Sequence, residues 1–509
     1  MKPAPFAYVR PGTLDGVLAE LAGEDAKVLA GGQSLVPVLA MRLGAPATLV
    51  DVTAVPELHE LAAGVADGGG GRRVLRIGAA VRQRAVERSA VAREVPLLGM
   101  ALPFVGHREL RSRGTVCGSL AHADPAAELP AVAACLDAVL EIAGPSGRRR
   151  VPADGFFAGF MTTALAEDEV LVAVELPVAG PGEGFGFAEI ARRHGDFALA
   201  GVATRVRVDS AGAVTGARLA AFGVSDRPLT CDVTALVADG PGGADGADGT
   251  DERALREVLG DVVAGMVDTA GDGHASAGYR RRLLRVLAAR ELAAARRRAA
   301  GAGEAGGVGL GPGGGGPGRG GRGADASGGP GPERGPRDRV DAAAVAEVTL
   351  TVNGAPVTVT VPPRQHLADT LRDRVRLTGT HLGCEHGVCG MCTVLVDGVA
   401  ARACLLFTVQ CDGAEIVTVE GLGTPDAQHP LQEAFSAHHA LQCGFCTPGM
   451  LMSAYGLLCD DPAPEQLARD MSGVLCRCTG YRGVLAAVAD VAQAHPGGIP
   501  TAPGAVPDG

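Results

Sequence analysis

Polar and apolar residues alternate over residues 347–361, "EVTLTVNGAPVTVTV", on both sides of Asn353-Gly354. A period of two predicts half-buried strands, and Asn-Gly is the dipeptide most typical of a two-residue hairpin turn. We therefore predict a β-hairpin here, with a helix to follow.

The first part of the chain shows a different pattern. Residues 27–32, "KVLAGG", and 47–52, "ATLVDV", predict short buried strands, and residues 34–43 between them carry apolar side chains at helical spacing. The Gly31-Gly32 turn would let bare backbone approach a pyrophosphate at a helix start, but a plain strand-to-helix turn fits the same pattern.

Beyond residue 429 the pattern becomes helical and essentially free of strands. Amphipathic helices are predicted for the segments 431–441, 447–458 and 481–494.

Glycine and proline interrupt these patterns. Residues 295–344 form a Gly/Pro/Arg-rich linker by composition, residues 238–251 a shorter loop, and residues 496–509 a disordered tail. A Gly309-x-Gly311-x-x-Gly314 match lies inside the linker, but without a preceding strand or a following helix we do not assign it to a dinucleotide.

Charge and composition exclude several function classes. The formal net charge of −11 over 509 residues argues against a nucleic-acid partner. Neither lysine of the chain, Lys2 or Lys27, is followed by Ser or Thr, so a Walker-type phosphate loop is excluded. No secretory leader and no run of 18 apolar residues is found, so we expect a cytoplasmic protein without a transmembrane segment.

Ten of the 13 cysteines lie beyond residue 380. In a cytosolic chain such clustering points to metal binding or catalysis rather than to disulfides. Cys411 and Cys459 stand apart from the tight groups, and we expect both to be small buried hydrophobes.

The first group has the spacing C-x4-C-x2-C-x11-C, whose first three cysteines match a plant-type [2Fe–2S] loop. A zinc site usually pairs two short knuckles, whereas three sulfurs here share one Gly-rich loop, so iron–sulfur is the favoured interpretation. The residues are Cys384, Cys389, Cys392 and Cys404.

The second group contains a Cys-x-x-Cys pair, which 29 intervening residues separate from a Cys-x-Cys pair. A redox dithiol would need a βαβ setting, which is absent. Four thiolates suit a second [2Fe–2S] cluster, and spacing alone leaves zinc open. The residues are Cys443, Cys446, Cys476 and Cys478.

These motifs resemble a known family. "GTHLGCEHGVCGMCTVLVDG", "QCGFCTPGM" and "CRCTGY" are similar to the two-cluster small subunit of molybdenum hydroxylases, the xanthine dehydrogenase, aldehyde oxidase and carbon monoxide dehydrogenase family. "MKPAPFAYVRP", "LAGGQSLVPVLAMRL", "GTVCGSLAHADPAAELPA", "RRHGDFALAGVA" and "HASAGYRRRLLRVL" resemble its FAD-binding medium subunit. The resemblance covers nearly the whole chain apart from the linker.

The resemblance implies an α+β multidomain protein, a fusion of two subunits whose order is the reverse of that in single-chain xanthine dehydrogenases. The expected parts are an FAD-binding domain of the vanillyl-alcohol-oxidase/CO-dehydrogenase flavoprotein type (1–180), its C-terminal α+β subdomain (181–294), the linker (295–344), a plant-ferredoxin-like β-grasp [2Fe–2S] domain (345–422), a four-helix-bundle [2Fe–2S] domain (423–495) and the tail (496–509).

The resemblance also implies site residues. The FAD diphosphate is expected along Ala30, Gly31, Gly32, Gln33, Ser34 and Leu35, a second flavin turn at Thr115, Gly118 and Ser119 with Asp124 on polar groups of the cofactor, and the pterin of the partner near Gln442 and Cys478. Cys117 stands where the family commonly has glycine, which puts the flavin contact at that position in question. We assign no role to His107, His122, His194, Arg192 or Arg193, and expect no catalytic residue on this chain.

The implied function is that of an oxidoreductase subunit. With FAD and two [2Fe–2S] clusters, the chain would carry electrons from a separate Mo-pterin subunit that oxidises an aldehyde, an N-heterocycle or CO, and deliver them to NAD⁺, oxygen or another external acceptor. We expect a heteromeric complex with that large subunit, and we expect the complex to be dimerised. The alternatives are a stand-alone flavin/iron–sulfur reductase and a non-catalytic assembly protein, although a scaffold would have no need of the eight cysteines.

Overall fold

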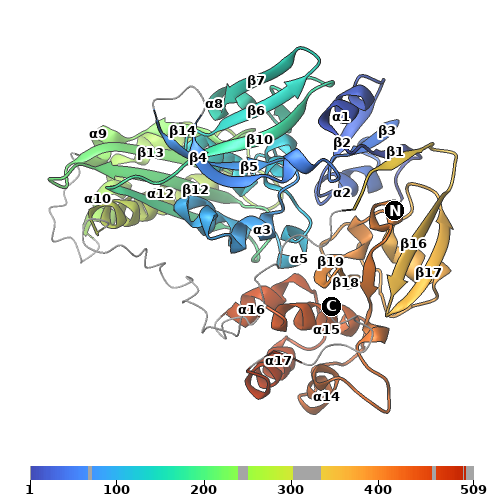
Figure 1. Ribbon diagram of the computed structural model, residues 1–509. Helices are drawn as coiled ribbons and strands as arrows, with labels where there is room; N and C mark the ends of the chain where they lie inside the picture. The colour runs from blue at the N-terminus through green and yellow to red at the C-terminus, as the bar shows by residue number, and fades with distance from the viewer. Residues whose placement is uncertain are drawn as a thin grey trace. The chain divides into compact units, whose positions relative to one another are not determined.

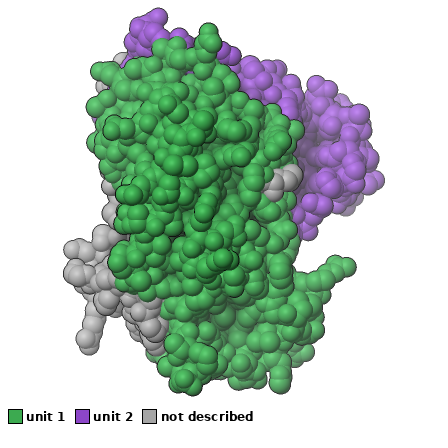
Figure 2. Space-filling model, turned by 90° about the vertical axis from the view of Figure 1, so that its right-hand side faces the viewer, with its two compact units in different colours: residues 1–56, 107–114, 311–509 green, residues 57–106, 115–310 purple. Residues whose placement is uncertain are grey.

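The computed structural model describes residues 2–66, 71–238, 250–301, 334–460, 466–496 and 498–499. Figure 1 shows the helices and strands along the chain, and Figure 2 colours the two compact units into which the chain divides. Unit 1 comprises residues 1–56, 107–114 and 311–509, and unit 2 comprises residues 57–106 and 115–310. Both units combine sheets with helices, as the predicted α+β class requires.

The first sheet of unit 1 has the strand order β15-β1-β3-β2. β1, β3 and β2 run parallel, and β15 is antiparallel to β1. The helix predicted for residues 34–43 is shorter than expected, because the chain leaves the helix before Arg42, whose φ is +58°. The elements are β1 (Ala7–Arg10), α1 (Leu14–Leu21), β2 (Ala26–Leu29), α2 (Leu35–Ala40), β3 (Thr48–Asp51) and β15 (Arg337–Val340).

The second sheet of unit 1 has the order β17-β16-β20-β18-β19. Its hairpin turns at Asn353 and Gly354, whose φ angles of +49° and +78° suit a mirror-image two-residue turn, so the predicted hairpin is confirmed. The predicted helix follows as α13 and the π-helical turn η4. The elements are β16 (Ala346–Val352), β17 (Ala355–Val361), α13 (Leu367–Asp369), η4 (Thr370–Arg374), β18 (Thr393–Val396), β19 (Val399–Arg402) and β20 (Glu415–Val417).

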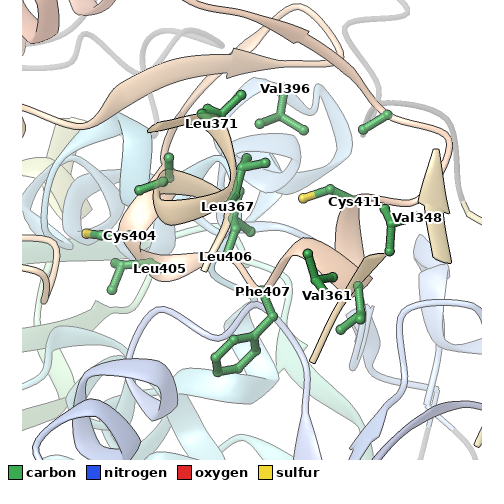
Figure 3. Close-up of a cluster of buried hydrophobic side chains, with 14 of the residues drawn as sticks. Val348, Val361, Leu367, Leu371, Val396, Cys404, Leu405, Leu406, Phe407 and Cys411 are labelled. Atoms are coloured by element: carbon green, nitrogen blue, oxygen red, sulfur yellow. The ribbon is translucent and has the colours of Figure 1, made fainter. Parts of the chain in front are cut away.

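One hydrophobic core joins these two sheets. Figure 3 shows its part around Leu367, Leu406 and Phe407, where side chains from the second sheet and α13 converge. From the first sheet's side, the Phe6 ring lies 5.0 Å from the Phe407 ring in an edge-on contact. Residues 1–56 therefore share a core with the predicted β-grasp domain, a long-range association that local periodicity does not reveal.

The last part of unit 1 is helical. The segment predicted as 447–458 forms α15 over the same residues, and its neighbours start or end within a few residues of the prediction. A second core cluster lies among these helices and includes Phe435, Met450 and Val488. The elements are α14 (Pro430–Ala437), α15 (Thr447–Leu458), α16 (Leu467–Asp470) and α17 (Arg482–Ala494).

Unit 2 begins with an antiparallel sheet of order β4-β5-β10-β6-β7. Every residue of its central strand β10 is buried, as expected for a strand with a neighbour on each side. The elements are β4 (Leu61–Val65), β5 (Arg73–Gly78), β6 (Val139–Gly144), β7 (Gly147–Pro152), β10 (Val170–Pro177), α3 (Gln83–Arg88), α4 (Pro96–Ala101), α6 (Val116–His122) and α7 (Glu128–Cys135).

The remaining part of unit 2 is a sheet of order β11-β12-β13-β14 packed on a long helix, α12. Gly184 permits this packing, because a Cβ there would lie 2.0 Å from the Ala295 carbonyl oxygen of α12. The elements are β11 (Glu183–Ile190), β12 (Ala200–Val208), β13 (Val214–Phe222), β14 (Leu229–Asp232), α9 (Thr234–Ala238), α10 (Thr250–Val258), α11 (Gly260–Met266) and α12 (Ala277–Gly301).

The predicted linker, 295–344, is too long at both ends. Its first residues continue α12 to Gly301, because Ala and Arg are good helix formers, and its last residues contain β15, which pairs with β1. Residues 302–333, including the Gly309-x-Gly311-x-x-Gly314 match, lie outside the described residues, as do 239–249 and most of the predicted tail. Among the described helices, none has the length and apolarity needed to cross a membrane.

Candidate functional site

A β-hairpin brings together two cysteines of the first group. β18 starts directly after Cys392, and β19 ends two residues before Cys404. Thr393 and Arg402 are paired across the hairpin, and the Ala403 N–H donates to the Cys392 carbonyl oxygen at 3.1 Å. The long gap in the C-x2-C-x11-C spacing is therefore the length of one hairpin.

The loop before β18 places the other two thiols beside this pair. The N–H groups of His386 and Cys389 donate to Cys384 Sγ at 3.5 and 3.3 Å. Hydrogen bonds from the Cys389 and Cys404 thiols, with those two N–H groups, hold the pKa of Cys384 far below its ordinary value. Thiols and N–H donors thus converge as a cluster with anionic ligands requires.

The second group gathers where two helices begin. Cys446 caps α15, and the segment with Cys476 and Cys478 precedes α17. The Sγ atoms of Cys443 and Cys478 are 3.6 Å apart, close to the roughly 3.8 Å that two thiolates about 2.3 Å from one tetrahedral metal would show. Within this group, burial raises the pKa of Cys446 to about 12, helped by a hydrogen bond with Cys476.

Cys476 accepts most of the hydrogen bonds in the second group. The Thr479 hydroxyl and N–H donate to its Sγ at 3.2 and 3.4 Å, and the Cys478 N–H donates at 3.4 Å. Burial alone would raise the pKa of Cys476, but these hydrogen bonds lower it overall. These hydrogen bonds therefore stabilise the thiolate form of Cys476, which is the form that binds metal, relative to an ordinary cysteine.

The thiols of the second group approach each other in two pairs, Cys443 with Cys478 and Cys446 with Cys476. A structural zinc site needs four donors about one centre, whereas a two-iron cluster takes two thiolates on each iron. The pairing of Cys443 with Cys478 suits the latter arrangement.

The two cysteine loops touch through their backbones. The Leu475 N–H donates to the Cys389 carbonyl oxygen at 2.9 Å, so a residue adjacent to Cys476 is bonded to a cysteine of the first group. A Cβ on Gly390 would lie 2.4 Å from the Gly473 carbonyl oxygen, and one on Gly449 would lie 2.5 Å from the Gly390 carbonyl oxygen. Glycine is thus required on both sides of this contact.

A buried arginine ties the same loops together. Arg402 is fully buried and donates to the carbonyl oxygens of Gly390 at 3.0 Å and Gly473 at 2.8 Å, and to the Thr393 hydroxyl. Its counter-ion is Glu109 in α5 (Arg108–Arg111), with Nη2 3.0 Å from Oε2. Burial raises the pKa of Glu109, but Arg402, assisted by His107 and Arg108, brings it below its ordinary value.

The two cysteine groups differ in exposure. Cys389, Cys392 and Cys404 are buried, whereas Cys443 and Cys478 are exposed. Beside the exposed pair lie Gln442 and the exposed apolar side chains Leu441 and Phe445, and the Phe445 ring stacks on His381 at 4.8 Å. Of the isolated thiols, Cys411 is buried as predicted, but Cys459 is exposed because it caps the last turn of α15.

The predicted diphosphate turn, Ala30 to Leu35, connects β2 to α2 in unit 1. Gly31 faces backbone, since a Cβ would lie 2.2 Å from the Arg113 carbonyl oxygen, and Gly32 has a φ of +73°. The Gln33 amide donates to the Gly31 carbonyl oxygen at 2.8 Å, while its buried Oε1 has no hydrogen-bond partner among the described residues. The unpartnered Oε1 of Gln33 could accept a hydrogen bond from a polar ligand. The two glycines are already needed for the close backbone contact and the positive φ, with or without a ligand.

The predicted second flavin turn, in unit 2, is the start of α6. The Thr115 hydroxyl accepts the Gly118 N–H at 3.0 Å and so caps the helix, and Ser119 is half-buried. Asp124 lies just beyond the helix, and burial raises its pKa. Cys117 points into the protein, donates to the Ile77 carbonyl oxygen and has its pKa raised to about 12 by burial, so it is a core thiol.

Four family models match the chain. "FAD binding domain in molybdopterin dehydrogenase" covers residues 4–179 and "CO dehydrogenase flavoprotein C-terminal domain" covers 185–295. "2Fe-2S iron-sulfur cluster binding domain" covers residues 350–410 and "[2Fe-2S] binding domain" covers 418–489. Each cysteine group lies within one of the two iron–sulfur matches.

Individual relatives agree with these matches. The 6-hydroxypseudooxynicotine dehydrogenase complex subunit alpha of Paenarthrobacter nicotinovorans is 34% identical over 303 residues, 59% of this chain and 97% of that protein. The nicotine 6-hydroxylase small subunit of the same organism is 54% identical over 157 residues, 30% of this chain and 91% of that protein. The chain belongs to the molybdenum hydroxylase family.

A solved structure related to this molybdenum hydroxylase subunit is that of quinoline 2-oxidoreductase from Pseudomonas putida 86. It matches with a TM-score of 0.52 and 35% identity, over 59% of this chain and 99% of that chain. The chain thus carries on one polypeptide an FAD-binding domain and two [2Fe–2S] binding domains of the molybdenum hydroxylase family.

Sequence reasoning missed the residues that join the cysteine loops. Arg402 lies two residues before Cys404, but nothing local distinguishes a buried arginine from a solvated one. Its partner Glu109 is almost 300 positions away in the sequence. The only available signal was the glycine content of the loops, which pointed to close backbone approach without naming the partner.

Proposed function

We propose that this chain is the electron-transfer component of a molybdenum hydroxylase. A separate Mo-pterin subunit would oxidise an aldehyde, an N-heterocycle or CO, and this chain would deliver the electrons to an external acceptor such as NAD⁺ or oxygen. The observation that carries the proposal is the direct contact of the two cysteine loops, the 2.9 Å hydrogen bond from Leu475 N–H to the Cys389 carbonyl oxygen. It provides a short connection between two redox sites on one chain.

The chain's own residues would hold the cofactors and set their separation. When bound, [2Fe–2S] clusters exchange single electrons and FAD exchanges one or two, which links a two-electron oxidation to either kind of acceptor. Arg402 and the Gly390 contact hold the cysteine loops together, and the eight cysteines supply the thiolates. The proposed ligands are Cys384, Cys389, Cys392 and Cys404 for one cluster and Cys443, Cys446, Cys476 and Cys478 for the other.

The exposed side of the helical domain is the proposed docking place of the large subunit. Gln442, Cys443 and Cys478 are exposed there together with the apolar side chains of Leu441 and Phe445. Exposed apolar side chains beside a redox site suit a surface that another protein covers. Gln442 would then contact the pterin side of the partner without binding iron itself.

For the flavin, we propose contacts along Ala30, Gly31, Gly32, Gln33, Ser34 and Leu35 and at Thr115, Gly118, Ser119 and Asp124. In the first turn, the unpartnered Oε1 of Gln33 supports a polar ligand. Gly32→Val would not be a clean test, since the φ of +73° and the nearby Val36 side chain make a larger residue unfavourable with or without flavin.

The names of the relatives favour one substrate class for the complex. Two of them are named for nicotine and for quinoline, which are both N-heterocycles. Among the three classes named above, we therefore propose an N-heterocycle as the substrate of the large subunit.

The decisive experiment reconstitutes the complex. The isolated chain should oxidise no N-heterocycle, aldehyde or CO, and adding the cognate large subunit should make the iron–sulfur absorption bleach when substrate is supplied. Gln442→Ala should slow this bleaching at unchanged iron content, because glutamine is not a cluster ligand. Gln493→Ala, at another exposed glutamine of the helical part, is the control and should leave the rate unchanged.

The outcomes separate the alternatives. Substrate turnover by the isolated chain would refute the need for a large subunit. NADH-driven dye reduction that is unaffected by the large subunit would indicate a stand-alone reductase. Absence of iron and flavin after cofactor-competent expression would indicate an assembly protein.

A further inference from the structure

The segment that follows the glycine-rich tract adds a strand to the first sheet of unit 1. β15 pairs antiparallel with β1, with Val340 opposite Tyr8 and Arg337 opposite Arg10. Without β15, β1 would be the open edge of the sheet β1-β3-β2. An open edge is a ready acceptor for another strand. We call residues 334–341 the strap.

One set of strap contacts reaches the N-terminal segment 1–56. The Arg339 guanidinium donates to Glu20 Oε2 at 2.9 Å and to the Thr48 hydroxyl at 3.0 Å, and Arg10 Nε donates to the Gly335 carbonyl oxygen at 2.9 Å. Pro336 packs against the backbone of Gly12, where a Cβ would lie 2.5 Å from its Cγ. Side chains therefore reinforce the strand pairing.

A second set of strap contacts reaches the β-grasp domain, 345–422. Arg334 forms an ion pair with Asp397, and their side chains are only 11% and 5% exposed. Arg337 donates to Asp412 Oδ2 at 2.8 Å and to the Glu347 carbonyl oxygen at 2.6 Å. Arginines of the strap thus pair with Glu20 in α1 on one side and with Asp397 and Asp412 of the β-grasp domain on the other.

We propose that the strap is a docking element that fastens the N-terminal sheet to the β-grasp [2Fe–2S] domain, and that it does so independently of the covalent linker. Strand addition supplies main-chain hydrogen bonds, and the guanidinium–carboxylate pairs set the register. The consequence for the fused chain is that the glycine-rich tract only keeps the two parts near each other, while the strap and the shared core decide their association. This proposal needs no bound cofactor and goes beyond the function proposed above.

The test uses the full chain with a specific protease site inserted after Gly314. After cleavage of the folded protein, the two fragments should stay together, and their dissociation on dilution can be followed by size-exclusion chromatography. Arg339→Ala should weaken the association several-fold, because its contacts with Glu20 and Thr48 join the two fragments. Arg334→Ala should weaken it less, because its partner Asp397 lies in the same fragment and only holds the strap in place. Arg374→Ala, at an exposed arginine of η4, is the matched control and should have no effect.

Hydrogen exchange provides a second readout on the uncut chain. Replacing the strap by a Gly/Ser sequence of equal length should speed exchange of the β1 amides while β16, paired on both sides, keeps its protection. If the variant with the replaced strap does not fold, Arg339→Ala is measured instead. The Arg339 side chain is 46% exposed, so its removal leaves no cavity. Dissociation constants equal to that of the Arg374→Ala control, or unchanged β1 exchange, would overturn the proposal.

Discussion

At the scale of single residues, Arg402 shows how much one buried side chain can organise. Its guanidinium reaches carbonyl oxygens in both cysteine loops and a carboxylate in α5. A buried ion pair is costly to form, but removing one partner is costlier still, because the other charge stays buried. Arg402 is therefore a positioning residue whose loss should affect both loops.

Arg402→Met should lower the free energy of unfolding by about 3–5 kcal/mol, because Glu109 would remain buried without its ion-pair partner. The double variant Arg402→Met/Glu109→Gln should recover part of this loss, since it removes the orphaned charge. Chemical denaturation of the full chain followed by circular dichroism measures both. Equal losses in the single and double variants would show that the ion pair is not the cause.

At the scale of elements, the β18–β19 hairpin and the glycine-containing loops position the two cysteine groups. The hairpin register places Cys392 beside Cys404, and Gly390 lets the first loop lie directly on the backbone of Gly473. Glycine is needed at position 390 for two reasons: the φ is +76°, and there is no room for a Cβ beside the Gly473 carbonyl oxygen. These two reasons can be separated by experiment.

Gly398, in the turn of the same hairpin, has a φ of +73°, but a Cβ at this position would meet no described atom within 4 Å. A substitution at Gly398 therefore tests the effect of the positive φ alone. Gly398→Ala should cost about 1–2 kcal/mol from left-handed strain alone. Gly390→Ala should cost clearly more and should also lower iron retention after gel filtration, since the methyl group would push the cysteine loops apart. Equal effects of the two substitutions would mean that the loop contact is not needed.

At the scale of the whole molecule, segments of one predicted domain belong to different compact units. Residues 1–56 share a core with the β-grasp domain, while residues 57–106 and 115–180 of the same predicted FAD-binding domain belong to unit 2. The two cysteine groups lie in different [2Fe–2S] binding domains, which a backbone hydrogen bond joins. Cofactor loss at one site therefore need not remove the other.

The whole protein should hold about four iron and four sulfide ions, as two sites of four thiolates imply. Cys389→Ser should remove one of two reduced-cluster EPR signals and leave the other, because the Cys389 carbonyl oxygen that accepts the Leu475 N–H is retained. Cys411→Ser is the control: this thiol is buried in the core, and its replacement should leave both signals. Zinc in place of iron after anaerobic expression would contradict the assignment.

The sequence by itself determined the local elements and the chemistry of the cysteines. The Asn353-Gly354 hairpin, the helix 447–458 and the two cysteine groups follow from period, turn chemistry and spacing, which are properties of neighbouring residues. Only the tertiary structure decided the pairing of β15 with β1, the ion pair of Arg402 with Glu109 and the shared core of Phe6 and Phe407. Each of these joins residues hundreds of positions apart, and burial, not local pattern, selects their partners.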